Sequence, residues 1–91
     1  MKKIIIVEDD TLLNKTLAYN LISDGYEVVS AYSYSMAVRL LNEDYHLALL
    51  DVKLPDGSGL DYCSILKEKH PETYIIFLTA NDKESDMLKG Y

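Results

Sequence analysis

The sequence has one cysteine, few basic residues and no long apolar run. Cys63 has no second cysteine with which to form an internal disulfide. The apolar run nearest the N-terminus covers only residues 4–7 before acidic residues follow, which is too short for a signal-peptide core or a membrane span. Nine Lys and Arg residues against 15 Asp and Glu residues give a formal net charge of -6, whereas nucleic-acid backbones are bound by clustered basic side chains. We therefore expect a cytoplasmic segment that contacts neither a membrane nor a nucleic acid directly.

The residues that are present suit one folded domain. Hydrophobic residues make up 48% and charged residues 26% of the 91 residues, a composition that is ordinary for a globular domain and excludes disordered and fibrous proteins. A chain of this length holds a single core, and no low-complexity tract or linker interrupts it. We expect one domain over residues 1–91.

Apolar runs bounded by charge alternate with segments of helical periodicity. Residues 4–7, 47–50 and 74–78 are continuous apolar runs, the pattern of parallel strands buried on both faces, and residues 26–31 indicate an edge strand. Four helices are expected. The first covers residues 11–24, the second begins after a cap at Ser33 or Ser35, the third begins after a cap at Ser58, and the fourth starts at Asn81 or Asp82. This alternation predicts an α/β fold with a parallel sheet and right-handed crossovers.

Polar side chains come directly at the ends of three expected strands. Glu8 and Asp9 follow the first strand, Asp51 ends the third, and Thr79 follows the fourth. Because the carboxyl ends of parallel strands share one edge of a sheet, we expect these side chains to converge. Two carboxylates about 4 Å apart repel by roughly 4 kcal/mol at an effective dielectric constant of about 20, so such a cluster holds either protons or a cation. Oxygen ligands favour Mg²⁺ or a similar ion.

An aspartate at this edge is a candidate nucleophile. A carboxylate beside a bound divalent cation can attack phosphorus and form an aspartyl phosphate. Asp51 ends a buried strand and precedes a turn rich in Pro and Gly, which is where open α/β sheets place their ligands. The Thr79 hydroxyl can donate a hydrogen bond to one of the transferring oxygens. We therefore expect phosphoryl chemistry at Asp51.

Three motifs together resemble a known family. Residues 7–10 are Val-Glu-Asp-Asp, residues 50–59 are Leu-Asp-Val-Lys-Leu-Pro-Asp-Gly-Ser-Gly, and residues 77–80 are Phe-Leu-Thr-Ala. In this order and on these strand ends, they resemble the receiver domain of bacterial two-component response regulators, particularly the subfamily of winged-helix transcription factors. The resemblance extends over the whole chain.

The resemblance implies a flavodoxin-like fold with strand order 2-1-3-4-5 and a signalling function. Asp51 would accept a phosphoryl group from a sensor histidine kinase or a small phosphodonor, and the phosphorylated form would control an output, such as transcription, in a longer parent protein. Receivers are not conventional enzymes, but they catalyse their own phosphoryl transfer and dephosphorylation. The resemblance also implies Mg²⁺ or Mn²⁺ held by Glu8, Asp9, Asp51 and the backbone carbonyl of Lys53, a switch hydroxyl on Thr79, and a small residue, Ala80, that leaves room for it.

The family pattern continues beyond residue 91. Receivers have a fifth strand, which begins with a lysine that contacts the phosphate, and a fifth helix, and neither is in this sequence. We therefore expect a C-terminally truncated receiver with strand order 2-1-3-4 and impaired phosphoryl transfer. The strand at residues 74–78 would be an unpaired apolar edge, and part of the face beside the first helix would be uncovered. This predicts a homo-oligomer such as a dimer, and as an alternative function a phosphorylation-incompetent fragment that self-associates by strand or segment exchange or only binds partners.

Other interpretations of the same residues have weaker support. Acidic residues 8–10 alone could serve only as helix-capping charges. Residues 51–57 superficially resemble a calcium loop, but the aspartate spacing differs and the distant glutamate is missing. An α/β phosphatase would need its aspartyl nucleophile after the first strand with an acid two residues later, and a nucleotide-binding fold would need a glycine-rich first turn. The sequence has neither.

Overall fold

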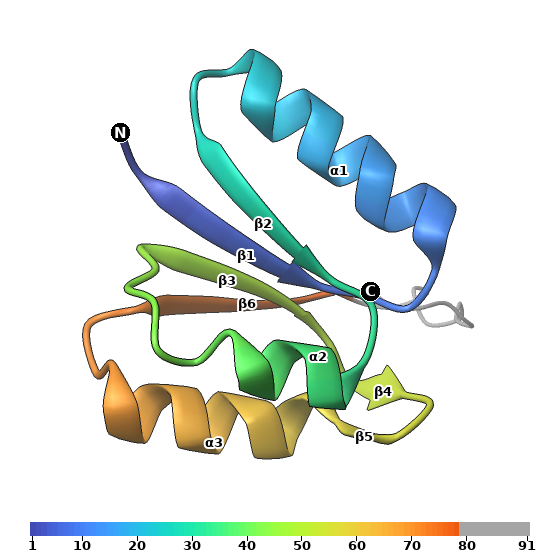
Figure 1. Cartoon of the computed structure of the whole chain (residues 1–91), viewed down its shortest axis with the longest axis vertical. Coiled ribbons are helices and arrows are strands. Elements are labelled where there is room, and N and C mark those ends of the chain that lie inside the picture. Colours follow the sequence, from blue (N-terminus) through green and yellow to red (C-terminus); the bar gives the residue numbers. More distant parts are fainter. Residues whose placement is uncertain (79–91) are drawn as a thin grey trace, which may run out of the picture.

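The computed structural model describes residues 1–78, and its strands and helices alternate as the sequence predicts (Figure 1). The elements in chain order are β1 (Lys3–Val7), α1 (Thr11–Ser23), β2 (Glu27–Ala31), α2 (Tyr34–Arg39), β3 (Leu47–Asp51), β4 (Lys53–Leu54), β5 (Gly57–Ser58), α3 (Gly59–Lys69) and β6 (Tyr74–Leu78). The helix expected from Asn81 or Asp82 lies outside the described residues. Among residues 1–78, no helix combines the length and the apolar character that crossing a membrane requires.

Four parallel strands form the main sheet in the order β2-β1-β3-β6. This confirms the predicted order 2-1-3-4, with β6 as the fourth strand, and it places β2 at an edge, as predicted. Helix α1 lies on one face of the sheet, and α2 and α3 lie on the other (Figure 1). Val7 at the end of β1 pairs with Ala31 of β2 and with Leu50 of β3. The carboxyl ends of the strands therefore meet at one edge of the sheet.

The apolar runs of β1 and β3 are buried because helices cover both faces of the sheet. Ile5 and Leu50 pack with Tyr62 of α3 in the core on the side of α2 and α3. Ile4 and Ile6, which point to the opposite face, belong to a second core that packs against α1. Burial of each large aliphatic side chain contributes about 1.5–3 kcal/mol to stability. Burial on two sides explains why these strands are continuous apolar runs.

Short polar side chains cap the three described helices at their N-termini. Asp10, Ser33 and Ser58 each accept a hydrogen bond at 3.1 Å from a backbone N–H two or three residues later. Of the two predicted alternatives for the second helix, Ser33 rather than Ser35 is the cap. Gly25 follows α1 with φ of 99°, a conformation that favours glycine and ends the helix where the sequence predicts. These local signals set the helix boundaries.

Three local features go beyond what the sequence pattern indicates. Strands β4 and β5 pair as a small antiparallel hairpin where only a turn was expected. Helix α2 ends at Arg39, so Leu40 and Leu41 lie beyond it, although both still pack on the core. On α3, Tyr62 is fully buried, and its neighbour Cys63 is half-buried and packs against the same core. The larger ring of Tyr62 removes more apolar surface from water when it faces the sheet.

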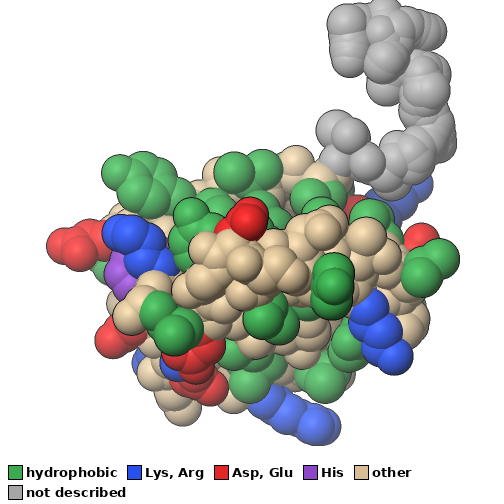
Figure 2. Space-filling model, turned by 90° about the horizontal axis from the view of Figure 1, so that it is seen from above, with side chains coloured by type: hydrophobic (Ala, Val, Ile, Leu, Met, Phe, Trp, Pro, Cys, Tyr) green, Lys and Arg blue, Asp and Glu red, His purple; other side chains and the backbone are tan. Residues whose placement is uncertain are grey.

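Basic side chains form no continuous area on the side of the molecule that Figure 2 shows. The Lys and Arg side chains there lie apart, separated by hydrophobic, acidic and neutral polar ones. This distribution agrees with the net charge of -6. A nucleic acid would therefore find no basic patch on this side.

Candidate functional site

Acidic side chains gather where β1 and β3 end. Val7 pairs with Leu50, so the residues that follow them, Glu8 and Asp51, lie beside each other at the carboxyl edge of the sheet. The Glu8 N–H donates to the Ala31 carbonyl at 3.0 Å, which extends the pairing between β1 and β2 by one residue and holds Glu8 in place. This edge is where open α/β sheets bind their ligands.

The structure brings together the three acidic residues that the sequence placed at this edge. Carboxylate oxygens of Glu8, Asp9 and Asp51 all lie within 4.8 Å of one another. Glu8 and Asp51 are only 5% and 6% exposed, whereas Asp9 is exposed. The cluster is therefore buried at its base and open to solvent on the side of Asp9, so a ligand can reach it.

Burial and mutual repulsion change the proton affinities of this cluster. The pKa of Glu8 is raised to about 7, first by burial and then by the carboxylates of Asp51 and Asp9, although the Asp10 N–H, which donates to Glu8 Oε2 at 3.0 Å, lowers it. Burial likewise raises the pKa of Asp51, against the opposing hydrogen bonds from Glu8 and from the Lys53 N–H. Either a proton or a cation relieves this repulsion.

The donor set of the cluster fits a hard divalent cation. Its three side chains offer only oxygen atoms, and Mg²⁺ takes one or two carboxylates together with other oxygen ligands. The backbone of Lys53 lies close by in β4, where its N–H faces Asp51 Oδ1 at 3.4 Å. A cation bound here would neutralise the like charges that raise the pKa values of Glu8 and Asp51.

The side-chain amide of Asn14, which was not predicted from the sequence, is buried next to the acidic cluster and holds the backbone there. Asn14 of α1 is fully buried, and its Nδ2 donates to the carbonyls of Glu8 at 3.0 Å and of Ala31 at 3.1 Å. These bonds tie α1 to the ends of β1 and β2. The signal in the sequence is a polar residue at helical spacing from Leu17 and Leu21, on the face that α1 turns toward the sheet.

Two further candidates cannot be placed in the same way. Thr79 and Ala80 lie outside the described residues. Thr79 directly follows Leu78, and Leu78 pairs with Asp51 in the sheet. The roles expected for these two residues therefore stay predictions.

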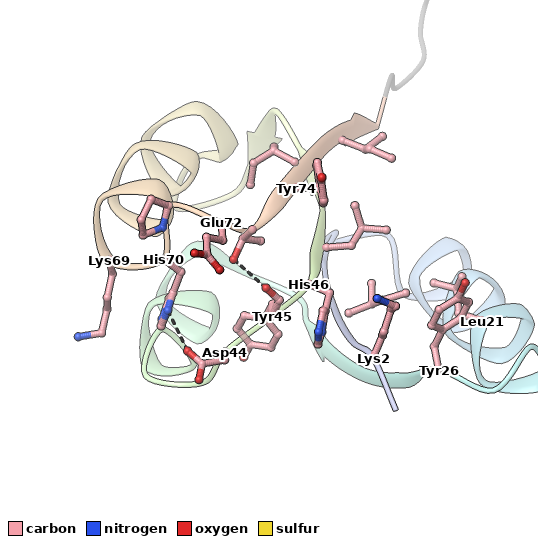
Figure 3. A pocket seen from close by; sticks show the side chains of 16 residues that line it. Lys2, Leu21, Tyr26, Asp44, Tyr45, His46, Lys69, His70, Glu72 and Tyr74 are labelled. Carbon is pink, nitrogen blue, oxygen red and sulfur yellow. Dashed lines mark hydrogen bonds and ion pairs between the residues drawn. The ribbon is translucent and has the colours of Figure 1, made fainter.

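A hollow of about 1040 Å³ lies away from the acidic cluster, at the amino ends of β1, β3 and β6 (Figure 3). Lys2, His46 and Tyr74 line it near the sheet, and Leu21 and Tyr26 line it on the side of α1. None of the three clustered acidic residues contributes to its lining. The chemistry expected from the sequence therefore belongs to the carboxyl edge and not to this hollow.

Comparison with known proteins gives one family. The family model "Response regulator receiver domain" matches residues 4–91. The non-phosphorylated receiver domain of HemR from Leptospira biflexa is 35% identical and superposes with a TM-score of 0.83, covering 99% of this chain and 73% of that one.

Two structures from Thermotoga maritima are also similar. The response regulator TrrA in complex with Mg²⁺ and BeF is 30% identical, with a TM-score of 0.81 over 97% of this chain and 77% of that one. The response regulator DrrB, described as an OmpR/PhoB homologue, is 36% identical, with a TM-score of 0.78 over 99% of this chain and 41% of that one. With the strand order of the sheet, these matches confirm the expected flavodoxin-like receiver fold. The chain belongs to the response regulator receiver domain family.

Proposed function

We propose that this chain is the phosphoacceptor module of a two-component response regulator and that Asp51 carries the phosphoryl group. The observation that supports this most directly is the position of Asp51. Its carboxylate ends a central parallel strand, is 6% exposed, and lies within 4.8 Å of two other carboxylates. A carboxylate with only a structural role would gain no stability from two neighbouring carboxylates.

The proposed step is the transfer of a phosphoryl group to a carboxylate oxygen of Asp51. That oxygen forms a bond to phosphorus while the bond from phosphorus to the donor atom breaks. The donor atom is the imidazole nitrogen of a phosphohistidine or the bridging oxygen of an acyl phosphate, and it leaves with the electron pair. A leaving imidazole takes up a proton from water. Burial of Asp51 limits competing contact with bulk water.

Glu8, Asp9, Asp51 and the Lys53 backbone carbonyl would hold Mg²⁺ or Mn²⁺ for this step. A divalent cation in that position would offset the negative charge on the oxygens of the transferred phosphoryl group. Glu8 and Asp9 supply the negative charge that attracts it, and the hydrogen bond from the Asp10 N–H orients Glu8.

Thr79 and Ala80 complete the proposed module. We propose that the Thr79 hydroxyl moves toward the phosphoryl group and donates a hydrogen bond to one of its oxygens. We propose that Ala80 is small enough to leave space for this movement of Thr79. The support is the sequence position of Thr79, one residue after the partner of Asp51 in the sheet.

The proposed partner is a sensor histidine kinase in the cytoplasm, and the proposed output is transcription through a longer parent protein. The similarity to DrrB, an OmpR/PhoB homologue, supports the transcriptional output. The family supports the kinase, because receivers are the acceptors of the phosphorelay. The single cysteine, which allows no internal disulfide, suits a reducing compartment.

Acetyl phosphate with Mg²⁺ tests this function directly. Intact-mass spectrometry of the treated protein is expected to show one phosphate adduct, which requires Mg²⁺ and disappears in Asp51→Asn. Asp24→Asn, which changes an exposed carboxylate at the end of α1, is the matched control and should keep the adduct. An unmodified wild-type protein, or an adduct that persists in Asp51→Asn, would show the proposal to be wrong.

A second candidate function, self-association, is favoured by the exposed strand β6. Within residues 1–78, β6 pairs with β3 on one side and with no strand on the other. Tyr74, Ile76 and Phe77 are 77%, 52% and 38% exposed. β6 contains no charged residue and no proline, the features that usually protect an edge strand from pairing with another chain. We propose that two copies join through the open edge of β6.

Sedimentation at several protein concentrations tests this self-association. A reversible dimer is expected for the wild type, and Ile76→Lys is expected to weaken it because a charge would then lie on the open edge. Ile22→Lys is the matched control, since Ile22 is exposed to a similar degree but lies on α1. A wild type that stays monomeric, or a dimer that both variants weaken equally, would count against β6 as the interface.

A further inference from the structure

Asp56 links the loop that follows Asp51 to the start of a separate helix. It lies in the turn between β4 and β5, and its two carboxylate oxygens accept hydrogen bonds from the N–H groups of Tyr34 at 2.7 Å and Ser35 at 3.0 Å. These are the first two residues of α2. Both hydrogen bonds lower the pKa of Asp56, so the charged form makes this contact.

The same loop is closed on itself beside Asp51. Lys53 pairs with Ser58 across the hairpin, and the Gly59 N–H donates to the Val52 carbonyl at 2.8 Å. A Cβ atom at Gly59 would collide with the backbone oxygen of Asp51, so the end of the loop rests directly on the backbone of the phosphoacceptor. Any shift of the loop therefore moves the Lys53 carbonyl relative to the Asp51 carboxylate.

Tyr34 strengthens the link between the loop and α2. A Cβ atom at Gly57 would overlap the Tyr34 ring, so the ring lies flush against the backbone of the hairpin. The ring also meets Tyr62 of α3 edge to face, with ring centroids 6.4 Å apart and planes at 81°. The Asp56 carboxylate holds the backbone N–H of the same tyrosine. The hairpin is thus fixed to a residue that the core itself holds.

We propose that Asp56 is a positioning residue for the metal site. By holding the β4–β5 hairpin against α2, it fixes the Lys53 carbonyl and N–H beside Asp51. This inference rests on the proposed function for its effect on the cation. Residues that orient metal ligands without touching the metal typically change the metal affinity by about 10-fold or more when they are replaced.

Ser33 allows the positioning role to be separated from simple stabilisation of α2. Its hydroxyl caps the same helix by accepting from the Met36 N–H at 3.1 Å, and it lies outside the hairpin. Ser33→Ala therefore weakens α2 without cutting the link to the loop. Asp61→Asn removes one exposed acidic charge close by in sequence and controls for the change in net charge.

Isothermal titration of Mg²⁺ into the full chain measures the first consequence. Asp56→Ala is expected to raise the dissociation constant about 10-fold. Asp56→Asn should raise it less, because the amide oxygen still accepts one of the two hydrogen bonds. Ser33→Ala and Asp61→Asn should stay within about 2-fold of the wild type. An unchanged affinity in Asp56→Ala, or an equal loss in Ser33→Ala, would overturn the proposal.

Amide hydrogen exchange without metal gives an independent test of the inference. Asp56→Ala is expected to speed the exchange of the Gly59 N–H, which closes the loop, while Ser33→Ala leaves it unchanged. A wild type that binds no Mg²⁺ refutes the proposed function, and the exchange data then decide the positioning role alone. Gly59 exchange that stays at the wild-type rate in Asp56→Ala, or that rises equally in Ser33→Ala, would show that Asp56 does not position the loop.

Discussion

The two edges of the parallel sheet carry polar groups in opposite arrangements. At the amino edge, polar side chains are paired with backbone carbonyls. The Thr73 hydroxyl donates to the Tyr45 carbonyl at 2.8 Å, the Lys67 ammonium donates to the carbonyls of Pro71 and Thr73, and a His70 ring nitrogen lies 2.7 Å from a carbonyl oxygen. At the carboxyl edge, three carboxylates face one another.

Under the proposed function, this difference separates residues that stabilise the fold from residues that bind the cation and accept the phosphoryl group. A paired buried polar group contributes about 1 kcal/mol and costs more when its partner is lost. Clustered like charges instead lower the stability of the fold unless a proton or cation joins them. The amino edge should therefore respond to mutation in stability alone. At the carboxyl edge, a mutation that removes one of the clustered charges should instead raise the stability of the fold and weaken metal binding.

The largest expected effect tests the amino edge. Thr73 is 2% exposed, and Thr73→Val removes the donor to the Tyr45 carbonyl without changing the shape of the side chain. We expect the free energy of unfolding to fall by about 2 kcal/mol, measured by urea denaturation. Thr73→Ser keeps the hydroxyl and should lose less. A change in Mg²⁺ affinity in Thr73→Val would contradict the separation of the two edges.

The pH dependence of stability tests the carboxyl edge. The pKa of Glu8 rises from 4.5 to about 7 on folding, so between these values the folded state keeps a proton that the unfolded state has released. The contribution of Glu8 to stability is therefore full below pH 4.5 and is lost as the pH rises through 7. Allowing for solvent screening, we expect a loss of about 1–2 kcal/mol without Mg²⁺.

Urea denaturation at pH 5 and pH 8 measures this loss, and Glu8→Gln is the reference because it cannot titrate. Saturating Mg²⁺ should restore stability at pH 8, since a cation replaces the proton. If the free energy of unfolding depends on pH equally in the wild type and in Glu8→Gln, repulsion at the cluster does not affect the folding equilibrium.

Neutralising Asp51 should stabilise the fold by a smaller amount. Asp51→Asn removes one of the facing charges and keeps an oxygen that can accept the Lys53 N–H. We expect the free energy of unfolding at pH 8, without Mg²⁺, to rise by about 1 kcal/mol. The stabilisation by Mg²⁺, measured as a shift in the melting temperature, should disappear in the same variant. Destabilisation instead would mark Asp51 as part of the structural framework.

The smallest effect is expected at an exposed residue of the amino edge. Lys67→Met removes the donor to the carbonyls of Pro71 and Thr73 but keeps the aliphatic stem. Because Lys67 is exposed, water replaces much of this interaction, and we expect a loss of only about 0.5 kcal/mol. Lys69→Met, two residues later on α3 and also exposed, is the matched control. Equal losses in the two variants would assign the effect to charge and not to the hydrogen bonds.

Much of the fold could be predicted because its signals are local. The continuous apolar runs of β1 and β3 indicate strands buried on both faces, and Ser58 is a capping residue directly before a helix. Glu8 and Asp51 could be placed together because parallel strands must end at the same edge. Their convergence therefore follows from topology, without knowledge of side-chain packing.

Other features could not be predicted because they depend on contacts between distant segments. Asn14 has an ordinary polar identity, and its role exists only because its amide meets carbonyls at the ends of two strands. The hairpin of β4 and β5 pairs two short segments whose composition indicates only a turn. Tyr62 is fully buried and Cys63 only half-buried because the rotation of α3 is set by packing against the sheet. No local sequence pattern predicts how α3 is rotated about its axis.

The sequence by itself determined the four strands of the main sheet, the helices between them, the cap at Ser58 and the acidic residues at the strand ends, since hydrophobic period and local hydrogen bonding act over a few residues. Only the tertiary structure decided that Glu8 and Asp51 are nearly inaccessible while Asp9 is open, and that Asp56 reaches the first turn of α2. Burial and long-range hydrogen bonds arise when separate elements pack. The electrostatics of the acidic cluster come from that packing and not from the order of its residues.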